Sequence, residues 1–392
     1  MKADLSFLSV VADGPDDYVI GNGERFVNVP GVAAAVIAAL DGTRTLAEAQ
    51  ARVLAEQGVD VDVAAFVTGL EGAGLLSRPE RPPNRWDRIR PHHVAWLFSR
   101  PAHAVLILLT VCAVAAAVAD PGVLPSLSAL VWSDSLTFTV AFAAGSWILV
   151  LVHELGHIAA ARSLGVRAEL SLGTRLQFLV VQTRITGIWG VPRRARYRAY
   201  LAGMRSDWFL VCAGACTLYV AEIPLVRLVM VICLSQIAWQ FLFFMRTDVY
   251  YAFANASGNK NLMADAQAYL RAALKGTPAV RDRPGRSVRV YAWFLAAGRV
   301  LGLAFFALYT VPITAEVCRR SVAELPGWQP VAALTLVAAG WLLYLGLLGR
   351  RLLRSGLLRS GLLRSGTVGS GTVGLRRFVP GPLRSRLPGW RR

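Results

Sequence analysis

The apolar residues of this 392-residue chain gather in six long segments, and this pattern restricts the fold more than any other feature. The segments cover residues 103–119, 136–161, 207–221, 224–245, 290–314 and 328–349. Most of them are near the length that a helix needs to cross a bilayer. The composition agrees, because 55% of the residues are hydrophobic and only 17% are charged. We therefore expect a mostly α, polytopic membrane protein with about six transmembrane helices.

Lysine and arginine are concentrated in every second loop between these segments. Nine arginines lie from Arg162 to Arg205 and eight lysines or arginines from Arg246 to Arg289, whereas the loop 120–135 has none. Loops rich in Lys and Arg stay in the cytosol according to the positive-inside rule. The sequence thus predicts a multi-pass integral membrane protein with both termini in the cytosol.

Residues 1–80 differ from the rest of the chain, with twelve acidic residues against five basic ones. Apolar and polar residues alternate on both sides of Gly21-Asn22-Gly23, which indicates a β-hairpin. Three amphipathic helices are expected in residues 30–42, 45–58 and 60–76. We expect a small α+β, winged-helix-like cytosolic domain. Its acidic balance argues against nucleic acid as a partner.

The remaining chain divides by composition into three parts. Residues 81–102 form a basic linker, and residues 103–349 form the expected transmembrane domain. Residues 350–392 form a low-complexity basic tail in which LLRSG occurs three times. A basic tail of this kind favours contact with anionic lipid headgroups, so the lipid bilayer is an expected partner.

The second apolar segment ends in the motif HELGH, residues 153–157. On a helix, His153 and His157 lie one turn apart on the same face, which is the spacing at which two imidazoles bind Zn²⁺. Glu154 then lies where a carboxylate can accept a proton from a zinc-bound water during peptide hydrolysis. In the simpler interpretation the motif is a polar helix end in which Arg162 neutralises Glu154. Ionisable groups at membrane depth are costly unless they are coordinated, which favours the metal site.

A catalytic zinc site needs a third protein ligand. The chain's other histidines, His92, His93 and His103, all lie upstream near the first segment. The expected topology places Asp248, just past the cytosolic end of the fourth segment, at the depth of the motif. We take Asp248 as the third ligand; Asp207 is the close competitor, and a solvated pair of Asp248 with Arg246 is the simpler alternative.

Between the second and third segments, residues 168–192 alternate between apolar and polar side chains. This alternation predicts a β-ribbon at the membrane edge. Two interpretations remain open. The ribbon receives an extended substrate by strand addition, or it is an ordinary cytosolic hairpin.

Three stretches together resemble a known family: HELGHIAAARSLG (153–165), YLAGMRSDW (200–208) and RTDVYYAFANASGNKNLMADA (246–266). They resemble the site-2-protease-like intramembrane zinc metalloproteases, in the peptide zinc metalloprotease branch. The resemblance implies that His153, His157 and Asp248 are the zinc ligands and Glu154 the catalytic base. It also implies the bacterial cytoplasmic membrane and Zn²⁺ as the cofactor. Val249 and Met204 stand where this family usually has other residues.

The N-terminal region, in residues 16–54 and 59–76, is similar to PqqD-like domains, in which a leader peptide adds as a strand to a small sheet. The two resemblances together imply a zinc-dependent metalloendopeptidase that cleaves or matures a ribosomally synthesised peptide precursor. Two alternatives are a non-catalytic leader-binding membrane adaptor for peptide export or immunity, and a regulatory intramembrane protease of a signalling protein. The oligomeric state is left open.

Overall fold

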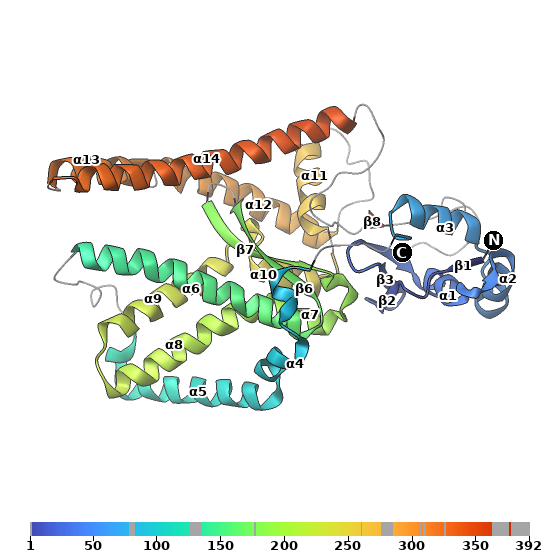
Figure 1. Cartoon of the computed structure of the whole chain (residues 1–392), viewed down its shortest axis with the longest axis horizontal. Coiled ribbons are helices and arrows are strands. Elements are labelled where there is room, and N and C mark those ends of the chain that lie inside the picture. The colour runs from blue at the N-terminus through green and yellow to red at the C-terminus, as the bar shows by residue number, and fades with distance from the viewer. Residues whose placement is uncertain are drawn as a thin grey trace.

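The computed structural model describes residues 2–77, 83–125, 135–175, 178–259, 261–275, 285–305, 307–308, 311–324, 327–362 and 376–377. The described chain is mostly helical and carries a small sheet region near its N-terminus. In Figure 1 this N-terminal region, which we call the head (residues 2–77), lies at one end of the molecule, and the long helices fill the other. The expected fold class is confirmed at this level.

Short strands and three helices form the head. Its elements are β1 (Lys2–Asp4), β2 (Ser9–Ala12), β3 (Asp17–Gly21), β4 (Phe26–Pro30), α1 (Gly31–Ala39), β5 (Asp41–Thr45), α2 (Leu46–Gln57) and α3 (Val63–Gly72). The strands β2, β3 and β4 form an antiparallel sheet with β3 in the centre, and β1 pairs with β5. The predicted hairpin and all three predicted helices are confirmed.

Local signals explain these boundaries. The Thr45 side chain accepts a hydrogen bond from the Glu48 amide, and the Glu48 carboxylate accepts one from the Thr45 amide, so a reciprocal capping box begins α2. Gly58 ends this helix in the left-handed region, at φ 67°. One face of the sheet packs against the helices through buried side chains that include Ile20 and Phe66.

The linker packs against the helical part. Its short helices are η1 (Arg85–Arg88), α4 (Pro91–Val94) and η2 (Ala95–Phe98). Asp87 accepts from Arg162 at 3.3 Å and from Arg167 at 2.8 Å, and the Arg162 Nε donates to the carbonyl of Ile89. Arg162 therefore anchors the linker instead of neutralising Glu154, and that part of the simpler interpretation is wrong.

Helices form most of the rest of the described chain. They are α5 (Arg100–Ala119), α6 (Ser135–Ser163), α7 (Arg193–Tyr200), α8 (Ala202–Val220), α9 (Pro224–Gln240), α10 (Asp248–Ala256), α11 (Leu262–Lys275), α12 (Arg286–Phe305), α13 (Val311–Glu324) and α14 (Gln329–Leu362), with the short η3 (Pro121–Val123) and η6 (Phe243–Met245). One apolar cluster joins α5, α6, α8 and α9, which lie side by side in Figure 1. Gly214 of α8 packs so closely on α9 that a Cβ there would lie 2.6 Å from Met230 Cγ, so these two helices form a tight hairpin.

Two described helical stretches are long and apolar enough to cross a membrane, namely Arg100–Ala119 and Ala141–Ser163. The segment 207–221 corresponds to the single helix α8, whereas the other three differ from the predicted segments. The segment 224–245 is interrupted after Gln240, and 290–314 contains both the end of α12 at Phe305 and the start of α13 at Val311. The helix α14 continues past residue 349 to Leu362, within the repeats of the tail. The described helices therefore give two candidate spans, not six.

The predicted β-ribbon is present as β6 (Arg167–Arg175) and β7 (Phe178–Thr186), which pair antiparallel. It packs against α6 through a cluster that contains Ile158, Ala168 and Ile185. The short η5 (Ile188–Gly190) follows the ribbon and leads into α7. A last short strand, β8 (Arg376–Arg377), pairs parallel with β4 of the head.

Candidate metal centre

The helix α6 brings His153 and His157 to one buried face, as their spacing predicts. The third predicted ligand, Asp248, is the first residue of α10. Among the described residues, these three side chains form a group whose ligand atoms all lie within 4.8 Å of one another. His92, His93 and His103 are exposed on the linker side and do not belong to this group. The structure thus brings the three predicted metal ligands together.

Hydrogen bonds to the Nδ1 atoms fix the orientation of the two imidazole rings. The Nδ1 of His153 donates to Asp207 Oδ2 at 2.7 Å, and the Nδ1 of His157 donates to the carbonyl of Ala199 at 2.7 Å. A carboxylate or a carbonyl oxygen can only accept, so each Nδ1 carries the ring proton. In the neutral rings both Nε2 atoms then present lone pairs to the same point.

Three acceptor atoms converge at that point. The two Nε2 atoms lie 3.2 Å apart, and Asp248 Oδ2 lies 3.1 Å from each of them. In a tetrahedral zinc site with bonds of about 2.0–2.1 Å, neighbouring ligand atoms are about 3.3 Å apart. Acceptors this close repel one another unless a proton or a metal cation lies between them. The donor set and its spacing therefore fit a zinc ion.

Asp248 remains ionised in this position, as a metal ligand must. Burial raises the pKa of its carboxyl, but when the histidines are protonated their positive charge and their Nε2–H donors lower that pKa below its usual range; with neutral rings, a bound cation would supply the stabilising charge instead. The guanidinium of Arg246 lies over the rings of Tyr250 and Tyr251 instead. The alternative of a solvated pair with Arg246 is therefore wrong, because the Asp248 side chain is only 13% exposed and its Oδ2 contacts the two histidines.

Glu154 lies in the same turn of α6 and is buried. It directly follows His153 in the sequence and lies between the two histidines on this turn. Its backbone carbonyl accepts a hydrogen bond from Thr183 of β7 at 3.2 Å. The β-ribbon thus contacts the turn of α6 that carries the predicted catalytic base.

Asp207 was the competing ligand, and the structure gives it another position. Its side chain is fully buried and contacts the Nδ1 of His153, on the far side of the ring from Asp248. A carboxylate that accepts from a metal-binding histidine fixes the ring and raises its basicity. Asp207 is therefore a supporting residue of the site and not one of the three converging ligands.

Sequence reasoning missed two further residues. The Gln240 side chain accepts from the Asp248 amide through Oε1 at 3.1 Å, and its Nε2 lies 3.4 Å from the Nε2 of His153. Gly203 packs directly against the His153 ring, so that a Cβ there would overlap the imidazole. Two sequence signals could have identified them: an amide side chain in an apolar segment for Gln240, and a glycine within a helix for Gly203.

Comparisons with known proteins add no further constraint. No protein-family model matches the chain, and neither a curated protein nor a solved structure matches it. What can be inferred about its function therefore follows from the chemistry of its own residues.

Proposed function

We propose that this chain is a membrane-embedded, zinc-dependent metalloendopeptidase that cleaves or matures a ribosomally synthesised peptide precursor recruited by its head. One observation carries the proposal. Two imidazole nitrogens and one carboxylate oxygen converge at 3.1–3.2 Å beside a buried glutamate. Two histidines and a carboxylate, with a glutamate as general base, are the residue types that zinc peptidases use.

Each group of residues has a separate role in the proposed reaction. His153, His157 and Asp248 would hold Zn²⁺, which when bound would supply Lewis-acid polarisation of the scissile carbonyl and would acidify water. The Glu154 carboxylate accepts the proton of the attacking water and passes it to the nitrogen of the leaving amine. Asp207 and the Ala199 carbonyl hold the two Nδ1 protons and so keep both Nε2 atoms directed inward.

Exposed apolar surface supports the membrane part of the proposal. The side chains of Ile107 and Val118 on α5 are 64% and 78% exposed, which in water would be unfavourable for so apolar a helix. The helices α8 and α9 share an apolar cluster with the two candidate spans, so we include them in the bilayer. With the basic loops on one side, we propose about six spans in the bacterial cytoplasmic membrane and cytosolic termini.

The head supplies a strand edge for a precursor. The short β8 already pairs in parallel with Val27 and Asn28 on the outer edge of β4, so this edge accepts an added strand, and a bound precursor would take the place of β8. A peptide bound there would be tethered to the same chain as the metal centre. Tethering raises the effective concentration of the peptide at that centre without new contacts.

The test uses the full-length protein in detergent with short precursor peptides encoded next to its gene. We expect cleavage that stops on chelation and returns with added Zn²⁺. We also expect Glu154→Gln to abolish cleavage while the zinc content stays unchanged. Glu222→Gln is the matched control, because Glu222 pairs with Arg227 at an exposed loop.

Each outcome separates the proposal from its alternatives. Cleavage of the precursors by the Glu154→Gln variant at the rate of the unaltered protein would overturn the catalytic role. Zinc binding without cleavage of any precursor would favour the leader-binding adaptor. Cleavage of a membrane signalling protein, and not of the precursors, would favour the regulatory protease.

A further inference from the structure

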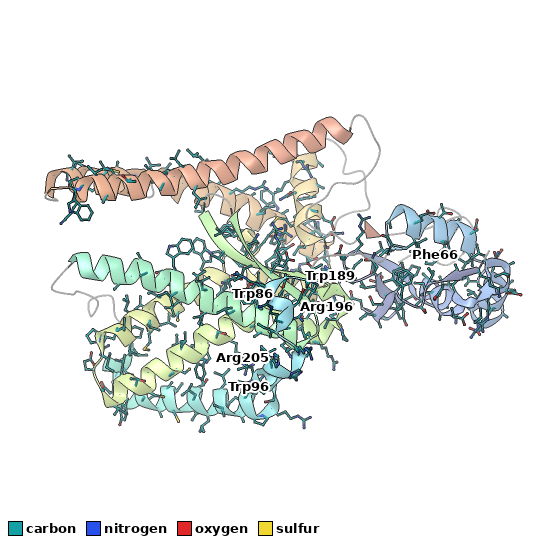
Figure 2. All side chains as sticks on the ribbon, viewed as in Figure 1. Phe66, Trp86, Trp96, Trp189, Arg196 and Arg205 are labelled. Atoms are coloured by element: carbon teal, nitrogen blue, oxygen red, sulfur yellow. The ribbon has the colours of Figure 1, made fainter. Side chains whose placement is uncertain are left out.

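The largest fully buried side chain of the described residues is an arginine, Arg196 of α7. Its side chain is 1% exposed, and its Nη1 lies 2.8 Å from Oδ1 of Asp13, whose side chain is 3% exposed. Asp13 belongs to the head, in the turn between β2 and β3. Figure 2 shows Arg196 in the helical part near the head, and Phe66 inside the head itself. A buried ion pair therefore joins the two parts of the molecule.

Apolar contacts surround this ion pair. Trp189 of η5 packs against Val19 and Phe26 of the head, on the sheet face opposite to the core side chain Ile20. The guanidinium carbon of Arg196 lies 4.9 Å from the centre of the Trp189 ring. This packing removes the ion pair from water. A solvated ion pair contributes little to stability, whereas removal of one partner of a buried pair leaves an uncompensated charge and is strongly destabilising.

The same guanidinium also holds the elements that carry the metal ligands. It donates to the carbonyls of Val191 at 2.8 Å and Trp189 at 3.2 Å, and to Asn255 Oδ1 at 3.5 Å. Asn255 lies on α10, two turns after Asp248, and its Nδ2 donates back to the carbonyl of Arg193 at the start of α7. Arg196 thus braces α7 against the helix that begins at the carboxylate ligand.

One turn after Arg196, α7 carries the carbonyl that orients the second histidine. Ala199 accepts the Nδ1 proton of His157 at 2.7 Å. The position of α7 therefore decides whether the Nε2 of His157 faces the other two ligand atoms. A continuous chain of contacts leads from Asp13 of the head, through Arg196 and Ala199, to a metal ligand.

We propose that the docked head is a structural part of the metal centre, and that Asp13 and Arg196 are positioning residues that hold α7 where it orients His157. Without Asp13, the buried guanidinium loses its counter-charge and must reorganise toward water, which displaces α7. The inference rests on the proposed metal site but not on the cleavage of any peptide. It gives the head a second task beside recruitment of a precursor.

The experiment measures metal binding alone, with the full-length protein in detergent. Co²⁺ is titrated into the metal-free protein, because its visible spectrum reports the ligand geometry as well as the affinity. We expect Asp13→Asn to weaken Co²⁺ binding about tenfold and to alter the spectrum. Asp62→Asn is the matched control, because Asp62 caps α3 on the head surface and asparagine caps a helix equally well.

A second variant excludes simple unfolding of the head. Arg196→Gln leaves the sequence of the head intact, and we expect a similar loss of Co²⁺ affinity. The double variant should lose no more than either single variant, because both remove one interaction. Affinities and spectra of Asp13→Asn equal to those of Asp62→Asn would overturn the inference. Absence of Co²⁺ binding in the unaltered protein would overturn the proposed metal site instead.

Discussion

The head and the candidate metal centre are built on opposite principles. The interior of the head consists of apolar side chains. The hydrogen bonds that begin and end its helix α2 join residues only three or four positions apart in the sequence. The centre buries polar side chains, namely His153, Glu154, His157, Arg196, Asp207, Gln240, Thr247 and Asn255. Their partners come from far along the chain, since His153 and Asp207 are 54 residues apart and His157 and Asp248 are 91 apart.

This difference predicts where a substitution will have its effect. A buried apolar side chain contributes by its area and volume, so its loss lowers the free energy of unfolding. A buried polar group must keep its partner, because desolvation without a hydrogen bond is costly and the partner is left unpaired as well. Apart from the docking residue Asp13, we expect changes in the head to alter stability first, and changes in the centre to alter metal binding first.

The same substitution at two helical glycines gives the largest contrast. Gly203→Ala places a methyl group inside the His153 ring, so we expect the purified variant to have lost its zinc. Gly72→Ala adds a methyl group where no atom lies within 4 Å, and we expect a gain of about 0.4–1 kcal/mol in the stability of the head. Zinc content and thermal unfolding of both variants check the two expectations.

The comparison fails if the two glycines behave alike. Full zinc content in the Gly203→Ala variant would mean that His153 can move without loss of the metal. A loss of zinc in the Gly72→Ala variant would mean that the site depends on the head's helices as well as on its docking contact.

Asp207→Asn should have a smaller effect that is still confined to the centre. The asparagine oxygen can accept the Nδ1 proton of His153, but the negative charge that raises the basicity of the ring is lost. We expect metal affinity to fall by about 10- to 100-fold, with thermal unfolding of the metal-free protein little changed. Asp120→Asn is the control, because Asp120 is an exposed cap of η3. Equal affinity in both variants would show that Asp207 does not orient the histidine.

The head could be predicted from sequence because its signals are local. The glycine hairpin, the Thr45–Glu48 capping pattern and the terminal Gly58 each lie within one element, and the structure has all of them. The HELGH spacing is local in the same sense. It places both histidines on one face whatever the rest of the chain does.

The rest of the centre depends on contacts that no local pattern contains. Asp248 was selected over Asp207 only through the expected topology, and the structure places both against His153. The Ala199 carbonyl could not have been found, because every residue has a carbonyl and only the fold decides which one meets a histidine. Helix ends were missed in 290–314 because an apolar run does not report where the backbone turns.

The smallest expected effect tests whether the head's local stability reaches the centre. Thr45→Ala removes the side-chain acceptor of the capping box and should cost about 1 kcal/mol of head stability. Thr68→Ala on the exposed face of α3 is the control and should be close to neutral. A domain with a usual stability of about 5–15 kcal/mol remains folded after such a loss, so the ion pair of Asp13 with Arg196 persists. Zinc affinity should therefore be the same in both variants, and only Thr45→Ala should lower the unfolding temperature. Weaker zinc binding by Thr45→Ala would show that the head affects the metal centre through its overall stability and not through its docking contact.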